Sequence, residues 1–421
     1  MAEQEKTGTM LGVYRVLDLT DEKGLYCGQL LGSFGADVIK IERLGGDPAR
    51  NIAPFFHNIP DPERSLFWFA YNTNKRGITL NIETADGREV FKRLVKTADV
   101  VVESSPPGYM DKLGLGYSEL EKINPGVVMT SITHFGQTGP YKDFQASDLA
   151  CWAMGGLLYI TGDPEKPPVR ISHIPFAYLM GSMDGAWATA VALCWRERSG
   201  EGQHVDVSIQ DSVSKTAWLI HELWEVTGEN YQRGSSYYKW PNSEVSLRLV
   251  WPAKDGYITF MPVFSPARAP HMSQLVKWLD DEGMADDFLR GIDWATLDFR
   301  FMSRVEGERI QDYFARFFQT KTKAELQEEG RRRDLGLQPI CTPEDILEHP
   351  QLEARDYWQK LQHAELGATI SYPGRFCLLS ETPCKLWCRA PLIGEHNREI
   401  YQEELGFSNE ELVSLKQAGI I

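Results

Sequence analysis

The chain has 421 residues, of which 42% are hydrophobic and 24% are charged, an ordinary globular composition with room for two or three domains. Acidic residues outnumber basic residues by 59 to 44, and the net charge of -15 argues against nucleic acid or an anionic membrane as the main partner. No run approaches about 20 apolar residues, and the start, MAEQEKTGTM, lacks an apolar core, so we expect no membrane span and no signal peptide. Seven cysteines without metal-ligand spacing are typical of reduced thiols in the cytoplasm and indicate no metal site.

The first part of the chain alternates strand and helix patterns. The predicted strands are the runs YRVLDLT, ADVIKIE, GITLNI, DVVVES and GVVMTSIT, and the helical run ADGREVFKRLVKTA lies between the third and the fourth. Such alternation predicts an α/β fold with a mostly parallel, Rossmann-like sheet. No G-x-G-x-x-G follows the first strand, so the sequence does not indicate a dinucleotide site.

The pattern changes twice farther along the chain. An Ala-rich helix is predicted over Pro175–Trp195, followed by a strand in HVDVSIQD and a helix in SVSKTAWLIHELWEV. The run LRLVWPAKDGYITF then predicts a β-hairpin that turns at Lys254, Asp255 and Gly256, and further helical runs follow it. We expect a large domain formed by 1–225 and the returning segment 336–421, a linker at 226–245, and a smaller α/β domain at 246–335.

Seven collinear segments resemble the class III coenzyme A-transferases, a family that includes formyl-CoA transferase, carnitine CoA-transferase and α-methylacyl-CoA racemase. They cover nearly the whole chain and read VLDLT…LLGSFGADVIKIER, NTNKRGITLNI, DVVVESSPPGYMDKLGLGYSEL, SITHFGQTGPY, RSGEGQHVDVSIQDSV, TPEDILEHPQLEAR and PLIGEHNREI. The resemblance implies a Rossmann-like large domain, a smaller α/β domain, and a dimer of interlocked rings.

The resemblance also implies a coenzyme A site. Coenzyme A carries a diphosphate and a ribose 3′-phosphate, which require charge-assisted donors. A solvated surface role is the alternative for each basic side chain. The family often has Asn-Phe after the fourth strand, where this chain has Ser104 and Ser105, which leaves room for a different acyl group. The positions that match CoA contacts in the family are Arg43, Lys75, Arg76, Ser104, Lys112 and Lys142.

The family's catalytic residue is an aspartate that attacks the donor thioester, and the chain lacks it at the matching position. In the family this aspartate begins a helix at a set distance before the G-x-G-Q turn, whose first glycine is Gly200 here. That distance leads to Ala177 or Tyr178, neither of which is a carboxylate. Asp184 lies six positions after Tyr178, a shift of about 9 Å along a helix and about 240° around it, so we expect a structural role for Asp184.

The racemase branch of the family uses a histidine directly before an aspartate. The matching residues are Ser147 and Asp148, so only the aspartate is present and exchange of an α-proton is not supported. His134 and His173 lie nearby in the sequence, and we interpret both as ordinary loop or core residues.

The sequence therefore predicts a subunit of a CoA-transferase that moves CoA between two carboxylic acids and pairs with a paralogue that bears the aspartate. Heteromeric members such as the succinyl-CoA:benzylsuccinate CoA-transferase of anaerobic aromatic degradation suggest succinyl-CoA and an aromatic or dicarboxylic acid as substrates. No covalently bound cofactor is expected. Two alternatives stay open: a self-sufficient acyl-CoA lyase, hydrolase or transferase that uses another residue such as Asp184, and a non-catalytic CoA-binding or regulatory protein.

Overall fold

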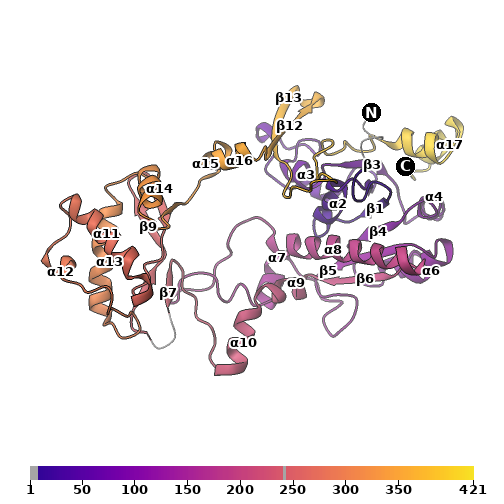
Figure 1. Cartoon of the computed structure of the whole chain (residues 1–421). Coiled ribbons are helices and arrows are strands. Elements are labelled where there is room, and N and C mark those ends of the chain that lie inside the picture. Colours follow the sequence, from indigo (N-terminus) through magenta and orange to yellow (C-terminus); the bar gives the residue numbers. More distant parts are fainter. Residues whose placement is uncertain (1–7, 240–242) are drawn as a thin grey trace. The chain divides into compact units, whose positions relative to one another are not determined.

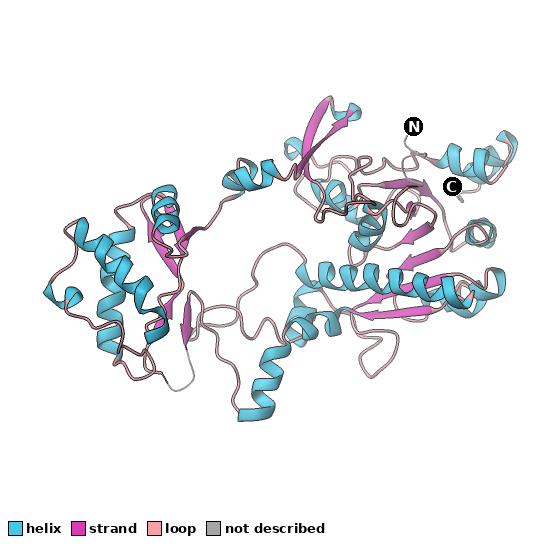
Figure 2. Cartoon of the chain, viewed as in Figure 1, coloured by secondary structure: helices cyan, strands magenta, loops and turns pink. Residues whose placement is uncertain are grey.

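The central feature of the fold is a sheet of six strands that all run parallel (Figures 1 and 2). The computed structural model describes residues 8–239 and 243–421, so most of the start used to judge a signal peptide, 1–7, lies outside the described residues. Each neighbouring pair of strands in the sheet has parallel register, which confirms the predicted α/β class. In spatial order the strands are β3 (Lys75–Thr79), β2 (Asp37–Glu42), β1 (Arg15–Leu19), β4 (Val100–Glu103), β5 (Val128–Thr133) and β6 (His204–Ser208).

Both faces of this sheet are covered by helices, which explains why β4 begins with the buried apolar run Val100, Val101 and Val102. Successive side chains of a strand point to opposite faces, so Val100 and Val102 pack with one group of helices while Val101 packs with the other. The first group is α2 (Leu25–Ser33), α7 (Asp148–Met154), α8 (Phe176–Ser199) and α9 (Ile209–Thr216). The second group includes α4 (Ala85–Val95), α5 (Tyr109–Lys112), α6 (Tyr117–Ile123) and α17 (Asn409–Gln417).

The prediction of one continuous helix over SVSKTAWLIHELWEV is wrong, because this segment forms two helices. Ala217 has φ -92° and ψ 15°, outside the helical region, and it separates α9 from α10 (Trp218–Thr227). The strand predicted in HVDVSIQD is also shorter, because the Ser208 hydroxyl accepts a hydrogen bond from the Asp211 amide and begins α9 directly. The periodic pattern thus indicated the type of structure correctly, strand or helix, but not where each element begins and ends.

The C-terminal segment returns to the edge of the sheet formed by β3. The Gly77 amide donates to His396 Nδ1 at 3.0 Å, and the His396 amide donates to the Gly77 carbonyl at 2.9 Å. The Pro391 carbonyl accepts hydrogen bonds from the Arg50 guanidinium at 2.9 Å and the Trp68 indole at 3.0 Å. This edge strand is therefore covered by chain from the other end of the sequence. The same segment carries α16 (Pro350–Ala354) and the hairpin of β12 (Trp358–His363) and β13 (Ala368–Pro373).

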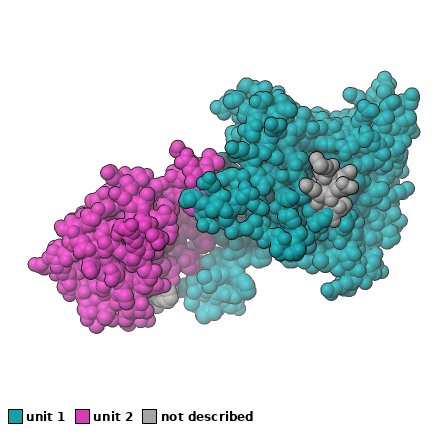
Figure 3. All heavy atoms as spheres, turned by 45° about the horizontal axis from the view of Figure 1, so that its top comes forward, with its two compact units in different colours: residues 1–158, 172–229, 350–421 teal, residues 159–171, 230–349 magenta. Residues whose placement is uncertain are grey.

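A second compact unit has its own sheet and core. Figure 3 colours the two units: one contains 1–158, 172–229 and 350–421, and the other contains 159–171 and 230–349. The predicted hairpin is confirmed, because β9 (Val250–Ala253) pairs antiparallel with β10 (Gly256–Thr259). Its core includes Trp251, packed against α11 (Ala269–Asp281) and α13 (Arg304–Phe318). The predicted domain boundaries stay a prediction, and the predicted linker includes 240–242, which are outside the described residues.

A fully buried ion pair lies inside the large unit, where Lys75 at the start of β3 meets Asp18 of β1. The Lys75 ammonium donates to Asp18 at 2.8 Å, to the Leu25 carbonyl at 2.7 Å and to Asn72 Oδ1 at 2.9 Å. Burial alone would raise the pKa of Asp18, but the ammonium groups of Lys75 and Lys40 hold that pKa below its ordinary value. Gly28 of α2 lies directly above, and a Cβ there would be 2.3 Å from Asp18 Oδ2.

We expect Lys75→Met to lower the free energy of unfolding by about 3–5 kcal/mol, because removing one partner leaves a buried carboxylate without its nearest cation. Urea denaturation at fixed protein concentration measures the loss. Lys92→Met is the matched control, since its ion pair with Glu89 is on the surface, where solvent screens the charges, and its loss should change stability little. A loss of the same small size in both variants would contradict the assigned role of Lys75.

Candidate functional site

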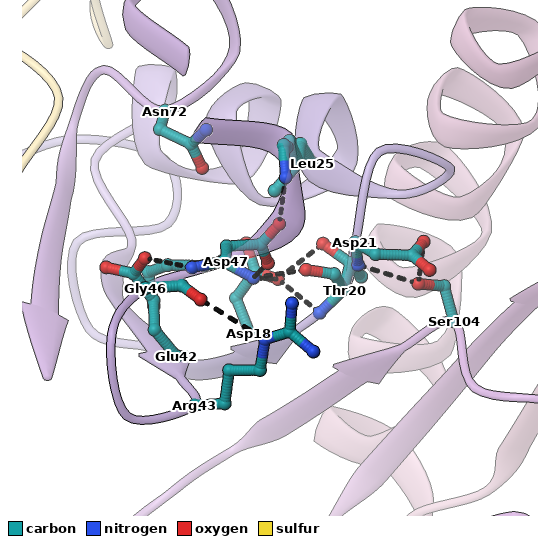
Figure 4. Close-up of polar contacts among 12 residues, drawn as sticks. Asp18, Thr20, Asp21, Leu25, Glu42, Arg43, Gly46, Asp47, Asn72 and Ser104 are labelled. Carbon is teal, nitrogen blue, oxygen red and sulfur yellow. Dashed lines mark hydrogen bonds and ion pairs between the residues drawn. The ribbon is translucent and has the colours of Figure 1, made fainter. Parts of the chain in front are cut away.

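The order of the strands reverses between β1 and β4, and the chain after both strands meets at the carboxyl edge of the sheet. In open parallel sheets this switch point is the usual place for a ligand. The Ser104 hydroxyl accepts a hydrogen bond from the Asp21 amide at 2.8 Å and donates to the Asp21 carboxylate at 2.7 Å (Figure 4). Ser104 is buried, so it joins the two strand ends and shapes the edge of the site.

One pocket, which we name the Arg43 pocket, opens at this edge with a volume of about 470 Å³. Residues at or just after the ends of β1, β2, β3 and β4 line this pocket, so four strand ends contribute to one cavity. Arg43 follows β2, is exposed, and donates from Nε to the Gly46 carbonyl at 3.3 Å. The lining is Leu19, Asp21, Ile41, Glu42, Arg43, Leu44, Asp47, Pro48, Leu80, Asn81, Ile82, Glu83, Ser105 and Tyr109.

Two residues of the Arg43 pocket were missed by the sequence reasoning. Tyr109, on α5, donates a hydrogen bond from its hydroxyl to Glu83 Oε1 at 3.0 Å. Burial and this carboxylate raise the pKa of Tyr109. Glu83 lies just beyond the carboxyl end of β3, as Arg43 lies beyond β2, so the rule that pointed to Arg43 applied to Glu83 as well.

A second pocket, which we name the Lys142 pocket, has a volume of about 410 Å³. At its inner side the Ser131 hydroxyl is 3.0 Å from Nε2 of His204, whose ring stacks on Tyr117. Burial raises the pKa of Glu103, although hydrogen bonds from Ser131 and from the Ser105 amide oppose the shift. The lining is Glu103, Pro106, Pro107, Gly108, Met110, Asp111, Gly116, Tyr117, Ser118, Met129, Ser131, Gln137, Lys142 and His204.

The structure places the remaining predicted CoA contacts away from these pockets. Lys75 begins β3 at the opposite edge of the sheet, and its buried ammonium already donates to three acceptors. Arg76 forms ion pairs with Asp37 at 2.6 Å and with Glu399 at 2.5 Å. Lys112 is exposed as the last residue of α5 and lines neither pocket. Of the predicted cations, Arg43 and Lys142 therefore line these two pockets.

The position matched to the family aspartate lies in the first turn of α8. Ala177 is fully buried, and Tyr178 is 5% exposed. The Tyr178 hydroxyl is 3.1 Å from Nε2 of His134, which directly follows β5. Burial and nearby Lys23 lower the pKa of His134 to about 4, so its imidazole is neutral at pH 7. Burial and nearby carboxylates raise the pKa of Tyr178, so a neutral phenol occupies this position.

Asp184 is held on the surface of α8, away from the first turn of the helix. Lys215 of α9 donates to its carboxylate at 2.6 Å, and the Trp187 indole donates at 2.9 Å. Burial opposes ionisation, but these hydrogen bonds hold the pKa of Asp184 below its ordinary value. A carboxylate with these partners fits the structural role that we expected from its position in the sequence.

The two residues that match the racemase pair begin α7. The Ser147 hydroxyl caps the helix by accepting from the Ala150 amide at 3.3 Å. Asp148 is buried and accepts from the Tyr178 amide at 3.2 Å, so it joins the starts of α7 and α8. His173 is exposed. Asp148 thus holds backbone in place here.

Within the described ranges, no group of three or more His, Cys, Asp or Glu side chains could hold a metal ion. Across 8–239 and 243–421, none of the helices is both long enough and apolar enough to cross a membrane.

Comparisons with known proteins agree with this fold. The model of the family described as "CoA-transferase family III" matches residues 11–397. The chain is 36% identical over 410 residues to succinyl-CoA:(R)-benzylsuccinate CoA-transferase subunit BbsE of Thauera aromatica, covering 97% of each chain. It is 32% identical to succinyl-CoA–D-citramalate CoA-transferase of Chloroflexus aurantiacus, covering 94% of each. A solved CAIB/BAIF family protein from Brucella suis superposes with a TM-score of 0.81 at 29% identity, covering 94% of this chain and 99% of that one.

The family match spans nearly the whole chain and includes every strand of the parallel sheet and both pockets. The chain therefore belongs to CoA-transferase family III.

Proposed function

We propose that this chain is the subunit of a heteromeric CoA-transferase that lacks the nucleophile and pairs with an aspartate-bearing paralogue. The observation that carries the proposal is the buried Tyr178 at the position where the family resemblance expects a carboxylate. The pair would move CoA between two carboxylic acids, with succinyl-CoA as donor and an aromatic or dicarboxylic acid as acceptor.

The chemistry of the transfer explains why a phenol does not replace the carboxylate. The carboxylate attacks the donor thioester, forms a mixed anhydride and releases the CoA thiolate. The thiolate then attacks the aspartyl carbonyl, which gives an enzyme thioester and releases the donor acid as its carboxylate. A tyrosine oxygen could accept an acyl group, but it has no acyl carbon of its own to which CoA could be attached. The neutral state of Tyr178 makes even the first step unfavourable.

The subunit role is supported by the relative from Thauera aromatica, whose name describes it as the BbsE subunit of its enzyme. That name also supports succinyl-CoA and an aromatic dicarboxylic acid as substrates of the present protein. The interlocked-ring dimer and a cytoplasmic location are parts of the same proposal. Asp184 is not supported as a substitute nucleophile, because Lys215 and Trp187 donate hydrogen bonds to its carboxylate.

For the CoA site we propose contacts from Arg43 and Lys142, with Ser104 shaping the edge between them. Each of the two cations follows a strand, Arg43 after β2 and Lys142 after β5, and lines one of the two pockets, and phosphate groups of a ligand are expected at such strand ends. Lys112 is retained as an outer contact because it is exposed on α5. We leave out Lys75 and Arg76, because their charges are neutralised by carboxylates of the chain itself.

The purified chain alone should transfer no CoA from succinyl-CoA to a second acid and should form no acyl intermediate, because Ala177 and Tyr178 occupy the position that matches the family aspartate. Incubation with succinyl-CoA and hydroxylamine, followed by peptide mass spectrometry, would detect a trapped carboxyl group. The positive control is the same treatment of an aspartate-bearing family member. Modification of Asp184, or of any other carboxylate in this chain, would refute the proposed role.

Arg43→Ala and Lys142→Ala should each weaken CoA binding tenfold to a hundredfold, since a lost charge-assisted contact costs about 1.5–3 kcal/mol. Isothermal titration calorimetry with CoA gives the change. Lys122→Ala serves as the control, because its ion pair with Glu119 lies on exposed α6. Unchanged affinity in both test variants would show that the assigned CoA site is incorrect.

Co-expression with the candidate paralogue should yield a mixed pair in native mass spectrometry, and transfer activity should appear only with that pair. Substituting the aspartate of the paralogue by asparagine should abolish all transfer, because the mixed pair then has no nucleophile. The matched control keeps that aspartate and carries Asp184→Asn in the present chain, which should retain transfer. Activity that survives loss of the paralogue's aspartate, or homodimers alone in its presence, would overturn the heteromer.

A further inference from the structure

We propose that Glu83 and Arg43 act against each other on the ribose 3′-phosphate of CoA, so that Glu83 limits how strongly the site prefers CoA over 3′-dephospho-CoA. This inference rests on the proposed CoA site and adds to it a residue that determines specificity. It follows from the charges that remain in the Arg43 pocket once the ion pairs of its lining are taken into account.

Most carboxylates of the pocket are already neutralised by cations. Asp21 pairs with Lys23, and Glu42 pairs with the buried Arg50 guanidinium at 2.6 Å. Asp47 pairs with the buried Lys40 ammonium at 3.2 Å. In the part of the lining that the structure describes, the Arg43 guanidinium instead donates to a carbonyl, and the Glu83 carboxylate accepts from a phenol.

Glu83 is fixed where it can act on a ligand. Its carboxylate accepts from the Tyr109 hydroxyl at 3.0 Å, and its amide donates to Asn81 Oδ1 at 3.1 Å. Its carbonyl accepts from Arg88 at 2.8 Å. Both its backbone and its side chain are therefore held at the end of β3, next to the end of β2 that carries Arg43.

The rest of the lining suits the base and sugar of a nucleotide. Leu19, Ile41, Leu80 and the Tyr109 ring supply apolar surface at the same strand ends as the two charges. An arginine in such a position favours a ribose phosphate, whereas an acidic residue favours ribose hydroxyl groups, which donate to it. CoA has a phosphate at the ribose 3′ position, and 3′-dephospho-CoA has a hydroxyl group there. Glu83 therefore repels only the first compound at that position.

The test measures the dissociation constants of CoA and 3′-dephospho-CoA by isothermal titration calorimetry with the full chain. Glu83→Gln should raise the preference for CoA over 3′-dephospho-CoA about fivefold, the effect of removing roughly 1 kcal/mol of repulsion between partly solvated charges. Arg43→Gln should shift the same ratio in the opposite direction. Tyr109→Phe should shift it in the direction of Glu83→Gln but less, because the carboxylate then loses the hydroxyl that holds it.

Glu89→Gln is the matched control, because it removes the same charge from the exposed face of α4, outside the pocket, and should leave the ratio unchanged. If Glu83→Gln also leaves the ratio unchanged while Arg43→Gln lowers it, the role of Glu83 is overturned and the proposed CoA site stands. If the wild-type chain binds neither compound, the proposed CoA site fails and this inference fails with it. A ratio that rises in Glu89→Gln as much as in Glu83→Gln would show only a general effect of net charge and would also overturn the role of Glu83.

Discussion

The parallel direction of all six strands is the constraint on which the candidate site depends. Because the strands run the same way, the chain after each of them emerges at one edge of the sheet, and residues distant in the sequence meet there. Arg43, Glu83 and Tyr109 belong to three different connections, yet they line a single cavity. Helices on both faces leave this edge as the part of the sheet where loops can form a site.

The fold could be predicted from the sequence to a large extent, because its signals are local. Apolar runs of four to six residues separated by helical patterns identified the strands, and a Lys-Asp-Gly turn identified the hairpin of β9 and β10. The break between α9 and α10 was not predictable in this way. Ala217 is a strong helix former, and its non-helical backbone depends on contacts that the local pattern does not contain.

The site was less predictable, because a lysine in a sequence does not reveal its partners. The sequence alone does not distinguish the roles of Lys75 and Lys142. Lys75 is buried beside Asp18, whereas Lys142 lines a pocket. The position of a residue along its strand separates them better than charge does: Arg43 follows a strand, whereas Lys75 begins one. Tyr178 is a third case, because only its hydrogen bond to His134 shows that the phenol is fixed at the helix start.

The return of the C-terminal segment to β3 has a consequence for how the chain folds during synthesis. The partners of Gly77 and Trp68 lie 319 and 323 positions later in the sequence, so a ribosome must make almost the entire protein before those bonds can form. Until then the Gly77 amide and the Trp68 indole lack these acceptors, and closing so long a loop carries an entropic cost. Such non-local contacts make folding slow and leave an open strand edge exposed to other nascent chains. The C-terminal segment thus completes the fold of the N-terminal part of the chain. Chains that end early would leave the edge strand β3 uncovered and prone to aggregation.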